Sequence, residues 1–345
     1  MLLRNIDTEK AACMIANWYE IFEKNTIKSQ IIPIPVDVLD YLRQDIVILP
    51  KECTNILSPD ATRTKHFNSY NDQFSDDEED GDTLPEFPEF SRQIADAIEK
   101  LGGSAFLKTD WHCPKDAQWI TLGQTLCVKD ITDVYQLLKA SSFCKEDFAE
   151  RSSSMGEYHV VIKKWRDIHP GSEFRCFVKN KSLIAISPRH WPSYHEHIAT
   201  ERSDIVSDIV SLFKEKIKNR FPLTNYVFDV YRPTKDKVII MDFSLYGKGY
   251  SDSLAFDYHQ LEADAIAATI DEEDDPEFRY LPEDCGIQPN KRNNYGFPQD
   301  VIDMFRSESG PSTSSNRNGE DESRLIHRLI DEWHIQTKND NSNDE

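Results

Sequence analysis

Residues 226–244 read YVFDVYRPTKDKVIIMDFS, and this stretch decides the fold. Two runs rich in β-branched and aromatic residues flank a polar turn, which predicts a hairpin of two antiparallel strands. Side chains alternate between the two faces of a strand, so Tyr226, Phe228 and Val230 share one face and Asp229 takes the other. The hairpin therefore presents one apolar face for burial and one face that carries a carboxylate.

The second strand of the hairpin places another carboxylate, Asp242, among apolar residues. Only some registers join the two apolar faces, and pairing Phe228 with Met241 is one of them. This register puts Asp229 opposite Ile240 and makes Asp242 its diagonal neighbour, about 7–8 Å away between backbones. The two side chains would then converge on one cation.

Two carboxylates on an otherwise apolar hairpin are costly without a countercharge. Magnesium supplies one, because it takes oxygen ligands that are usually one or two carboxylates completed by water and nucleotide phosphates. The pattern thus indicates a magnesium–phosphate site on the hairpin. A simply solvated face explains the same residues, and the pattern alone does not choose between the two interpretations.

Positive side chains, which a phosphate site needs, occur in three other segments, VVIKKW, EFRCFV and FLKTDWHCPKDAQWI. They are Lys163, Lys164, Arg175, Lys108 and Lys115. Lysine contacts phosphate as a point charge and arginine as a fork, although a surface lysine is more often only solvated. The chain contains neither a G-x-x-x-x-G-K-[ST] nor a G-x-G-x-x-G motif, so a nucleotide would not bind in a P-loop or a Rossmann domain.

The spacing of apolar residues predicts the elements around the hairpin. Residues 86–101 carry apolar side chains at helical spacing, and Gly102 and Gly103 end that helix. Strands are predicted in VVIKKW and in EFRCFVKN followed by KSLIAIS, and a helix from about Glu201 to Asn219 precedes the hairpin. Two strand hairpins around a long helix predict an α+β fold.

Length and charge limit the functional classes. The chain has 345 residues, 39% of them hydrophobic, which is enough for a core divided between two lobes. The formal net charge of -21 disfavours direct binding of nucleic acid and favours a basic protein partner, unless the acidity serves solubility alone. The sequence has neither an apolar run of about 18 residues nor a secretory signal at its start, which predicts a cytoplasmic protein without a membrane span.

Composition divides the chain into two lobes and two polar segments. Residues 1–158 form a predicted N-terminal lobe, and residues 159–305 form a C-terminal lobe that includes the linker strand before Trp165. The acidic stretch at about 58–83 has few apolar residues to bury and is predicted to be a disordered loop. Residues 306–345 are predicted to be a disordered tail with a short amphipathic stretch.

Several motifs, in the same order, resemble the cell-division-cycle 123 family from about Trp18 to Phe305. They are WYEIF, TIKSQIIPIP, PEFPEF, FLKTDWHCPKDAQWI, KKWRDIHPGSEFRCFVKN and YVFDVY followed by MDFS. The resemblance implies an ATP-grasp-like fold, in which two α+β lobes grip ATP together with Mg²⁺.

The resemblance also implies a set of site residues. The ATP-binding set is Lys108, Trp111, His112, Cys113, Lys115, Lys163, Lys164, Trp165, Arg175, Asp229, Asp242 and Ser244. Within it, Asp229, Asp242 and Ser244 are the implied magnesium ligands. The ATP-grasp metal motif usually reads acid-x-Asn, whereas this chain has Ser244 in the last position, and serine is a shorter and weaker ligand.

The family role implied by the resemblance is that of an assembly chaperone. Such a protein binds the C-terminal part of the gamma subunit of translation initiation factor 2 and thereby supports translation initiation and cell-cycle progression. The chain is expected to act as a monomer and without enzymatic activity. The alternatives are an ATP-grasp carboxylate–amine ligase, which would use the same ATP residues, and a scaffold that no longer binds nucleotide.

Overall fold

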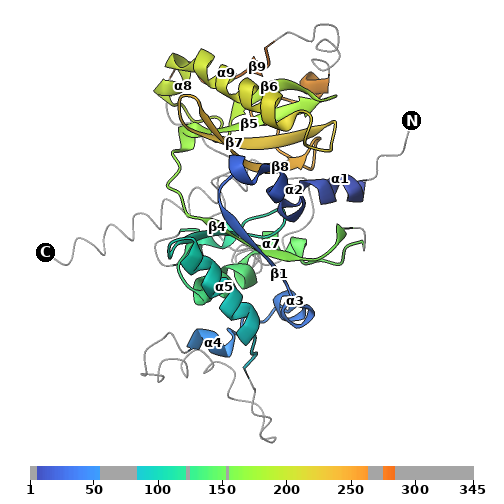
Figure 1. The fold of residues 1–345 in the computed structure, drawn as a ribbon, viewed down its shortest axis with the longest axis vertical. Coiled ribbons are helices and arrows are strands. Elements are labelled where there is room, and N and C mark those ends of the chain that lie inside the picture. Colours follow the sequence, from blue (N-terminus) through green and yellow to red (C-terminus); the bar gives the residue numbers. More distant parts are fainter. Residues whose placement is uncertain (1–5, 55–83, 122–124, 153–154, 263–274, 284–345) are drawn as a thin grey trace, which may run out of the picture. The chain divides into compact units, whose positions relative to one another are not determined.

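The computed structural model describes most of the chain. The described residues are 6–54, 84–121, 125–152, 155–262 and 275–283. Both segments that were predicted to be disordered, 58–83 and 306–345, lie outside the described residues. The described part combines helices with two sheets, which confirms the predicted α+β class (Figure 1).

The first sheet has antiparallel strands in the order β1-β4-β2-β3. Its strands are β1 (Ser29–Pro33), β2 (Ala105–Lys108), β3 (Cys127–Val128) and β4 (His159–Lys164). One face packs on a helical core through Leu107 and Ile162, which are fully buried. The other face carries Lys108, Val161 and Lys163, because side chains alternate along each strand.

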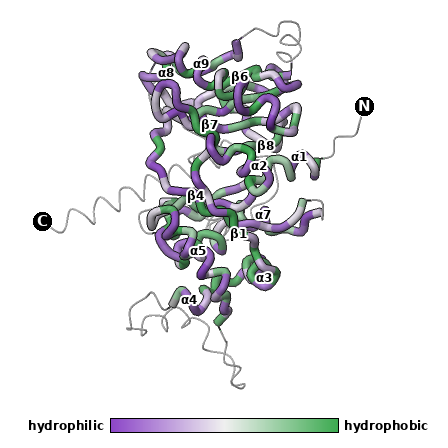
Figure 2. The backbone as a smooth tube through the Cα atoms, viewed as in Figure 1, coloured by the Kyte–Doolittle hydropathy of each residue, from purple (hydrophilic) through white to green (hydrophobic). Residues whose placement is uncertain are grey.

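Helices bury the apolar face of the first sheet. They are α3 (Val36–Arg43), α4 (Lys51–Thr54), α5 (Pro88–Lys100), α6 (Ile131–Ala140) and α7 (Ser142–Asp147). The helix α5 matches the predicted one: Phe90, Ile94 and Ile98 are buried at helical spacing, and Figure 2 shows polar residues between apolar ones along it. Gly102 and Gly103 end it at positive φ (104° and 81°), where glycine avoids the strain of a side chain.

The second sheet has the order β8-β7-β5-β6-β9, with β9 parallel to β6 and the other pairs antiparallel. Its strands are β5 (Glu173–Lys179), β6 (Ser182–Pro188), β7 (Tyr226–Thr234), β8 (Lys237–Leu245) and β9 (Glu277–Phe278). As predicted, Tyr226, Phe228 and Val230 share one face, and all three are fully buried. The hairpins β5–β6 and β7–β8 therefore form one continuous sheet.

Helices from two distant parts of the chain pack on this buried face. They are α1 (Ile6–Cys13), α2 (Ile15–Phe22), α8 (Glu196–Thr200) and α9 (Arg202–Leu212). The predicted helix at about 201–219 is α9 followed by a π-helical turn, Phe213–Ile217. Trp18 and Phe22 of α2 join the same core as Ile205 and Ile209 of α9.

The predicted register of the β7–β8 hairpin is wrong. Phe228 pairs with Phe243, not with Met241, and Asp229 lies directly opposite Asp242. The pairing shifts by one residue at two places, between Tyr231 and Thr234 and between Asp229 and Val230, and the two shifts cancel. The register at Asp229 is therefore the same as the register at the turn, Thr234↔Lys237. Alternation of apolar residues does not distinguish registers that differ by two residues, which is why the sequence pattern did not choose between them.

The sheets group the chain differently from the predicted lobes. Strand β4, which the sequence analysis assigned to the C-terminal lobe, pairs with β1 and β2 of the first sheet. Helices α1 and α2, which were assigned to the N-terminal lobe, pack on the second sheet. The lobe boundary at residue 158 stays a prediction. Among the described residues, no helix has both the length and the apolar character that a membrane span requires.

Candidate functional site

A row of polar residues crosses the second sheet from β6 to β8. Ser187 pairs with Arg175, Arg175 with Asp229, and Asp229 with Asp242. Residues that pair directly point to the same face of a sheet, so these side chains share the face opposite the Phe228 core. In the next row on this face Ala185, Phe177 and Val227 are apolar and buried, and the row ends at Ser244 on β8. The polar row therefore lies beside a buried apolar cluster.

The centre of the row is a buried ion pair. Arg175 donates from Nε to Asp229 Oδ1 at 2.8 Å and from Nη2 to Asp229 Oδ2 at 2.7 Å, a two-pronged contact. Arg189 donates to the same Oδ2 at 3.2 Å. Burial alone would raise the pKa of Asp229, but the two guanidinium groups outweigh it and lower that pKa. Asp229 is therefore ionised at neutral pH despite its burial.

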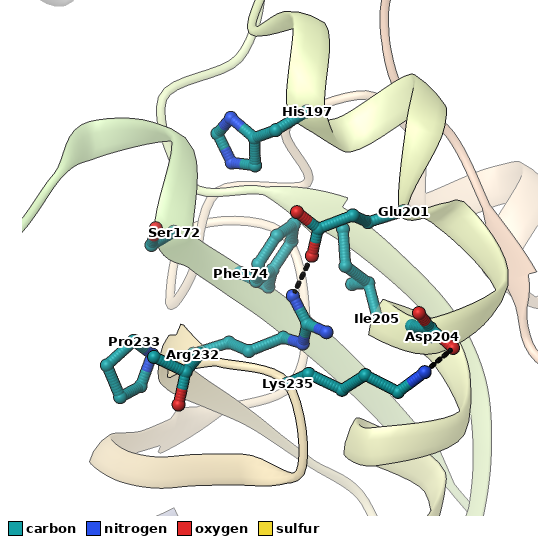
Figure 3. Close-up of a pocket in the computed structure, with 10 residues that line it drawn as sticks. Ser172, Phe174, His197, Glu201, Asp204, Ile205, Arg232, Pro233 and Lys235 are labelled. Atoms are coloured by element: carbon teal, nitrogen blue, oxygen red, sulfur yellow. Dashed lines mark hydrogen bonds and ion pairs between the residues drawn. The ribbon is translucent and has the colours of Figure 1, made fainter.

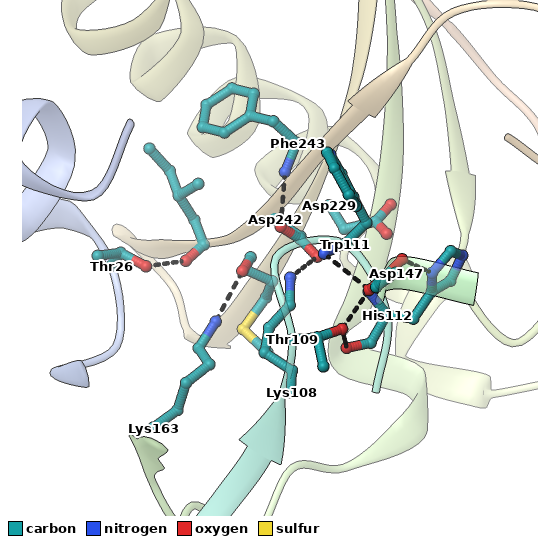
Figure 4. Close-up of polar contacts among 12 residues, drawn as sticks. Thr26, Lys108, Thr109, Trp111, His112, Asp147, Lys163, Asp229, Asp242 and Phe243 are labelled. Atoms are coloured by element: carbon teal, nitrogen blue, oxygen red, sulfur yellow. Dashed lines mark hydrogen bonds and ion pairs between the residues drawn. The ribbon is translucent and has the colours of Figure 1, made fainter. Parts of the chain in front are cut away.

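Two lysines from the first sheet reach the end of this row (Figure 4). Lys108, at the end of β2, donates to Asp242 Oδ2 at 2.6 Å. Lys163, on β4, donates to the carbonyl oxygen of Met241 at 2.9 Å. Met241 is the extra residue of a bulge between the pairs Asp229↔Asp242 and Val230↔Ile240, and bulges are frequent beside functional sites.

The loop after Lys108 adds two more polar groups. Burial lowers the pKa of Lys115, with Cys113 opposing the shift and Arg189 adding to it. Burial also raises the pKa of Cys113, against the effect of Lys115 and Lys108. The charges that act on Cys113 and Lys115 thus include Lys108 and Arg189, which belong to the lysine end and the arginine end of the row.

The structure brings together most of the predicted site residues. Lys108, Cys113, Lys115, Lys163, Arg175, Asp229 and Asp242 form one connected polar region. Ser244 lies two residues after Asp242 on β8, on the same face, and pairs with Val227. This arrangement joins residues that are up to about 130 positions apart in the sequence, as the pair Lys108–Asp242 (134 positions) illustrates.

Four predicted site residues have other surroundings. Trp111 donates from its ring nitrogen to the carbonyl oxygen of Lys10, and the Lys10 ammonium lies 5.1 Å from the ring centroid. His112 contacts Asp147 at 2.6 Å. Lys164 is exposed and follows Lys163 on the opposite side of β4, and the backbone of Trp165 bonds to Ser104. The contacts of these four residues are thus with groups outside the polar row.

Sequence reasoning missed two residues of this region, Arg189 and Asp252. Arg189 directly follows β6 and reaches Asp229 only because β6 pairs with β5. Asp252 lies in the loop after β8, where its charge acts on Arg175 and Lys115 and its carbonyl oxygen accepts from Arg175 Nη1 at 3.1 Å. The only sequence signal for Arg189 was a basic residue at the end of a predicted hairpin strand. Asp252 had no signal in the sequence.

The donor set fits a nucleotide triphosphate with magnesium. Five cations, Lys108, Lys115, Lys163, Arg175 and Arg189, outnumber the three carboxylates of Asp229, Asp242 and Asp252 by two. An excess of positive charge in a desolvated region favours a polyanion. Within the described residues no three His, Cys, Asp or Glu side chains form a metal site, but Mg²⁺ needs only one or two carboxylates when phosphates complete its shell.

A separate cavity of about 440 Å³ lies on the other side of the second sheet (Figure 3). Its charged side chains pair with one another: Arg232 with Glu201 at 2.6 Å, and Lys235 with Asp204 at 3.0 Å. Phe174, which lines it, belongs to the Phe228 face of the sheet. The cavity is therefore distinct from the polar row, and its paired charges leave no excess of either sign.

The affinity of the polar row for a phosphate ligand should depend on pH through Lys163. Burial, followed by repulsion from Lys108, lowers the pKa of Lys163 to about 8. Phosphate favours the charged ammonium, so affinity should fall as the pH rises above 8, by up to about tenfold per pH unit. Titrations at several pH values should show this slope in the wild type and lose it in Lys163→Met. Lys164→Met, a change at an exposed neighbour, should keep the slope; an equal slope in all three proteins would exclude Lys163 as its source.

Together the two sheets and the cation-rich row on the second sheet define an α+β protein, the class predicted from the sequence. A protein-family model, D123, matches residues 18–305. The chain belongs to the D123 family, which confirms the resemblance seen in its motifs.

Relatives and a solved structure agree with this membership. The "Translation initiation factor eIF2 assembly protein" of Xenopus tropicalis is 36% identical over 330 residues, covering 90% of this chain and 97% of the relative. The protein of the same name from Danio rerio is 33% identical over 311 residues, covering 86% and 89%. The structure of Cdc123 from Schizosaccharomyces pombe superposes with a TM-score of 0.62 at 29% identity, covering 80% of this chain and 98% of that one.

Proposed function

We propose that this protein binds ATP and Mg²⁺ at the polar row and helps to assemble translation initiation factor 2. The nucleotide proposal rests on one observation: Asp229 and Asp242 lie directly opposite each other on β7 and β8, next to cations that outnumber the carboxylates. Directly opposed side chains start about 4.5–5.5 Å apart, which is close enough for two carboxylates to share one cation. The names of the relatives support the assembly role.

Each group of residues has a distinct part in this proposal. Asp229 and Asp242 would hold Mg²⁺, with Ser244 in the third protein position beside them. Arg175 and Arg189 would bind phosphate oxygens while holding Asp229 in its ionised form. Lys108 and Lys163 would neutralise phosphate charge from the first sheet. Bound Mg²⁺ would supply the charge that lets carboxylates and phosphates occupy one site.

The proposed partner is the gamma subunit of translation initiation factor 2, bound through its C-terminal domain by a monomer of this chain in the cytoplasm. The chain's net charge of -21 favours a partner with a basic surface. Charged groups at the rim of an interface mainly steer encounter, whereas an apolar centre holds the complex. Association should therefore slow as salt rises, while dissociation should change little.

The partner proposal is tested by surface-immobilised kinetics across a salt series, with the isolated C-terminal domain of the gamma subunit as the ligand. An unrelated protein of similar positive charge serves as the control for non-specific attraction. ATP should strengthen binding only if the ATP-bound form has the higher affinity for the partner. An absence of binding at low salt, or equal binding of the control protein, would contradict the partner proposal.

The proposal assigns ATP a binding role without turnover. In an assay with purified protein and candidate acceptors, ADP should not accumulate beyond the level of a protein-free control. Release of ADP and phosphate in step with a joined product would instead establish a carboxylate–amine ligase, which uses the same set of phosphate-binding residues.

A further inference from the structure

One loop joins Lys108, the last residue of β2, to Lys115, the first residue of a short 3-10 helix. This loop does not belong to a helix or strand between Thr109 and Pro114. Its backbone must therefore be held by other contacts. Most of those contacts converge on one buried carboxylate, Asp147, the last residue of α7.

Asp147 binds the loop through both of its oxygens (Figure 4). Oδ2 accepts from the Thr109 hydroxyl, from the His112 backbone N at 3.0 Å and from the Trp111 backbone N at 3.4 Å. Oδ1 contacts Nδ1 of the His112 ring at 2.6 Å. The Asp147 side chain is only 5% exposed, so these contacts replace its hydration almost completely.

The contacts also close the loop on itself. The His112 carbonyl oxygen accepts from the Thr109 backbone N at 2.8 Å, and the Thr109 hydroxyl lies 3.1 Å from the same oxygen. Thr109 directly follows Lys108, and His112 is three residues before Lys115. A carboxylate that binds both Thr109 and His112 thus fixes the stretch of backbone between the two lysines.

We infer that Asp147 is a positioning residue for the proposed nucleotide site, on which this inference rests: it orients Lys108 and Lys115 without touching the polar row itself. Within the described residues its hydrogen bonds all go to the loop, whereas Asp229 and Asp242 bind cations of the row. Small displacements of binding groups weaken a site strongly, because charge and geometry must match together. Loss of Asp147 should therefore lower ATP affinity by about tenfold or more.

The test compares Asp147→Ala with two conservative variants. Asp147→Asn keeps the shape, and its amide oxygen can still accept from Thr109 and the two backbone N–H groups while its NH₂ donates to His112 Nδ1. Thr109→Val removes only the contacts of one hydroxyl, to Asp147 and to the His112 carbonyl oxygen. We expect a large loss of ATP affinity in Asp147→Ala and small losses in the other two, measured by calorimetry at a temperature where every variant is folded.

Asp208→Ala is the matched control for loss of a buried carboxylate. Asp208 is 9% exposed and accepts from Arg232 Nε at 2.7 Å and from the Asp236 backbone N at 3.1 Å, on the far face of the second sheet. Both alanine variants should melt at lower temperature than the wild type. Only Asp147→Ala should also lose ATP affinity, which a purely structural role would not predict.

A second readout needs no nucleotide. Hydrogen exchange at the amides of Trp111 and His112 should accelerate in Asp147→Ala without ATP and stay near the wild-type rate in Asp208→Ala. If Asp147→Ala binds ATP as tightly as the wild type does, the inference is overturned and the proposed function stands. Absence of ATP binding by the wild type would overturn both, and unchanged exchange would overturn the anchoring role itself.

Discussion

Asp229→Ala should lower the free energy of unfolding by about 3–5 kcal/mol, because it leaves a buried charge without its partner. The Arg175 side chain is 5% exposed and makes its two-pronged contact only with Asp229. Arg175 also donates to the carbonyl oxygen of Asp252, an uncharged group that does not neutralise the guanidinium. The same change removes one of the two carboxylates of the proposed magnesium site, so Mg²⁺-dependent ATP binding should also be lost.

The double variant Arg175→Met/Asp229→Leu separates these two effects. Replacing a whole buried ion pair by apolar residues of similar size is often neutral or stabilising. The double variant should therefore recover most of the stability in urea unfolding and recover none of the ATP binding. If Asp229→Ala unfolds at the same urea concentration as the wild type, the stabilising role of the buried ion pair is contradicted. ATP binding by the double variant would contradict the assignment of Asp229 and Arg175 to the ATP site.

Phe243→Ala should cost about 3–5 kcal/mol, as is typical for removing a buried aromatic ring. Phe243 is 2% exposed, and its ring centroid lies 4.1 Å from that of Phe221, 5.2 Å from Trp18 and 5.3 Å from Phe22. Because Trp18 and Phe22 are on α2, the change should also loosen α2. Hydrogen exchange in residues 15–22 should therefore accelerate together with the fall in stability.

Phe256→Ala is the matched control for this prediction. Phe256 is 6% exposed and packs on Phe177, with centroids 5.7 Å apart, in a separate cluster on the other face of the sheet. It should destabilise the protein without a selective loss of protection in α2. Equal effects of the two variants on residues 15–22 would contradict the packing of α2 on β8.

Local patterns in the sequence predicted the two faces of β7 well, whereas the faces predicted for β8 fail at the bulge, where Ile240 joins the core. Alternation placed Tyr226, Phe228 and Val230 in one core and Asp229 on the opposite face, because the side-chain period of a strand is fixed at two. Helical spacing likewise predicted α5 and its end at Gly102. These features depend on neighbours within a few residues, which a sequence states directly.

Pairing between distant segments could not be read in the same way. The bulge at Met241 shifts the alternation along β8, so that Ile240 joins the core that contains Phe243, and the pattern of apolar residues alone did not show this shift. Arg189 comes near Asp229 only through the β6–β5–β7 order of the sheet. The packing of Trp18 on Phe243 joins residues 225 positions apart, and its aromatic character alone did not indicate which sheet it would cover.

The central claim is that the row formed by Asp229 and Asp242 binds ATP with Mg²⁺. Calorimetric titration of the wild-type chain with ATP, in the presence and absence of Mg²⁺, tests it most directly. We predict saturable binding of one ATP that weakens strongly when Mg²⁺ is removed, and loss of that magnesium dependence in Asp242→Asn, which keeps the shape but removes the charge. No binding by the wild type, or binding that is equally tight without Mg²⁺, would contradict the account.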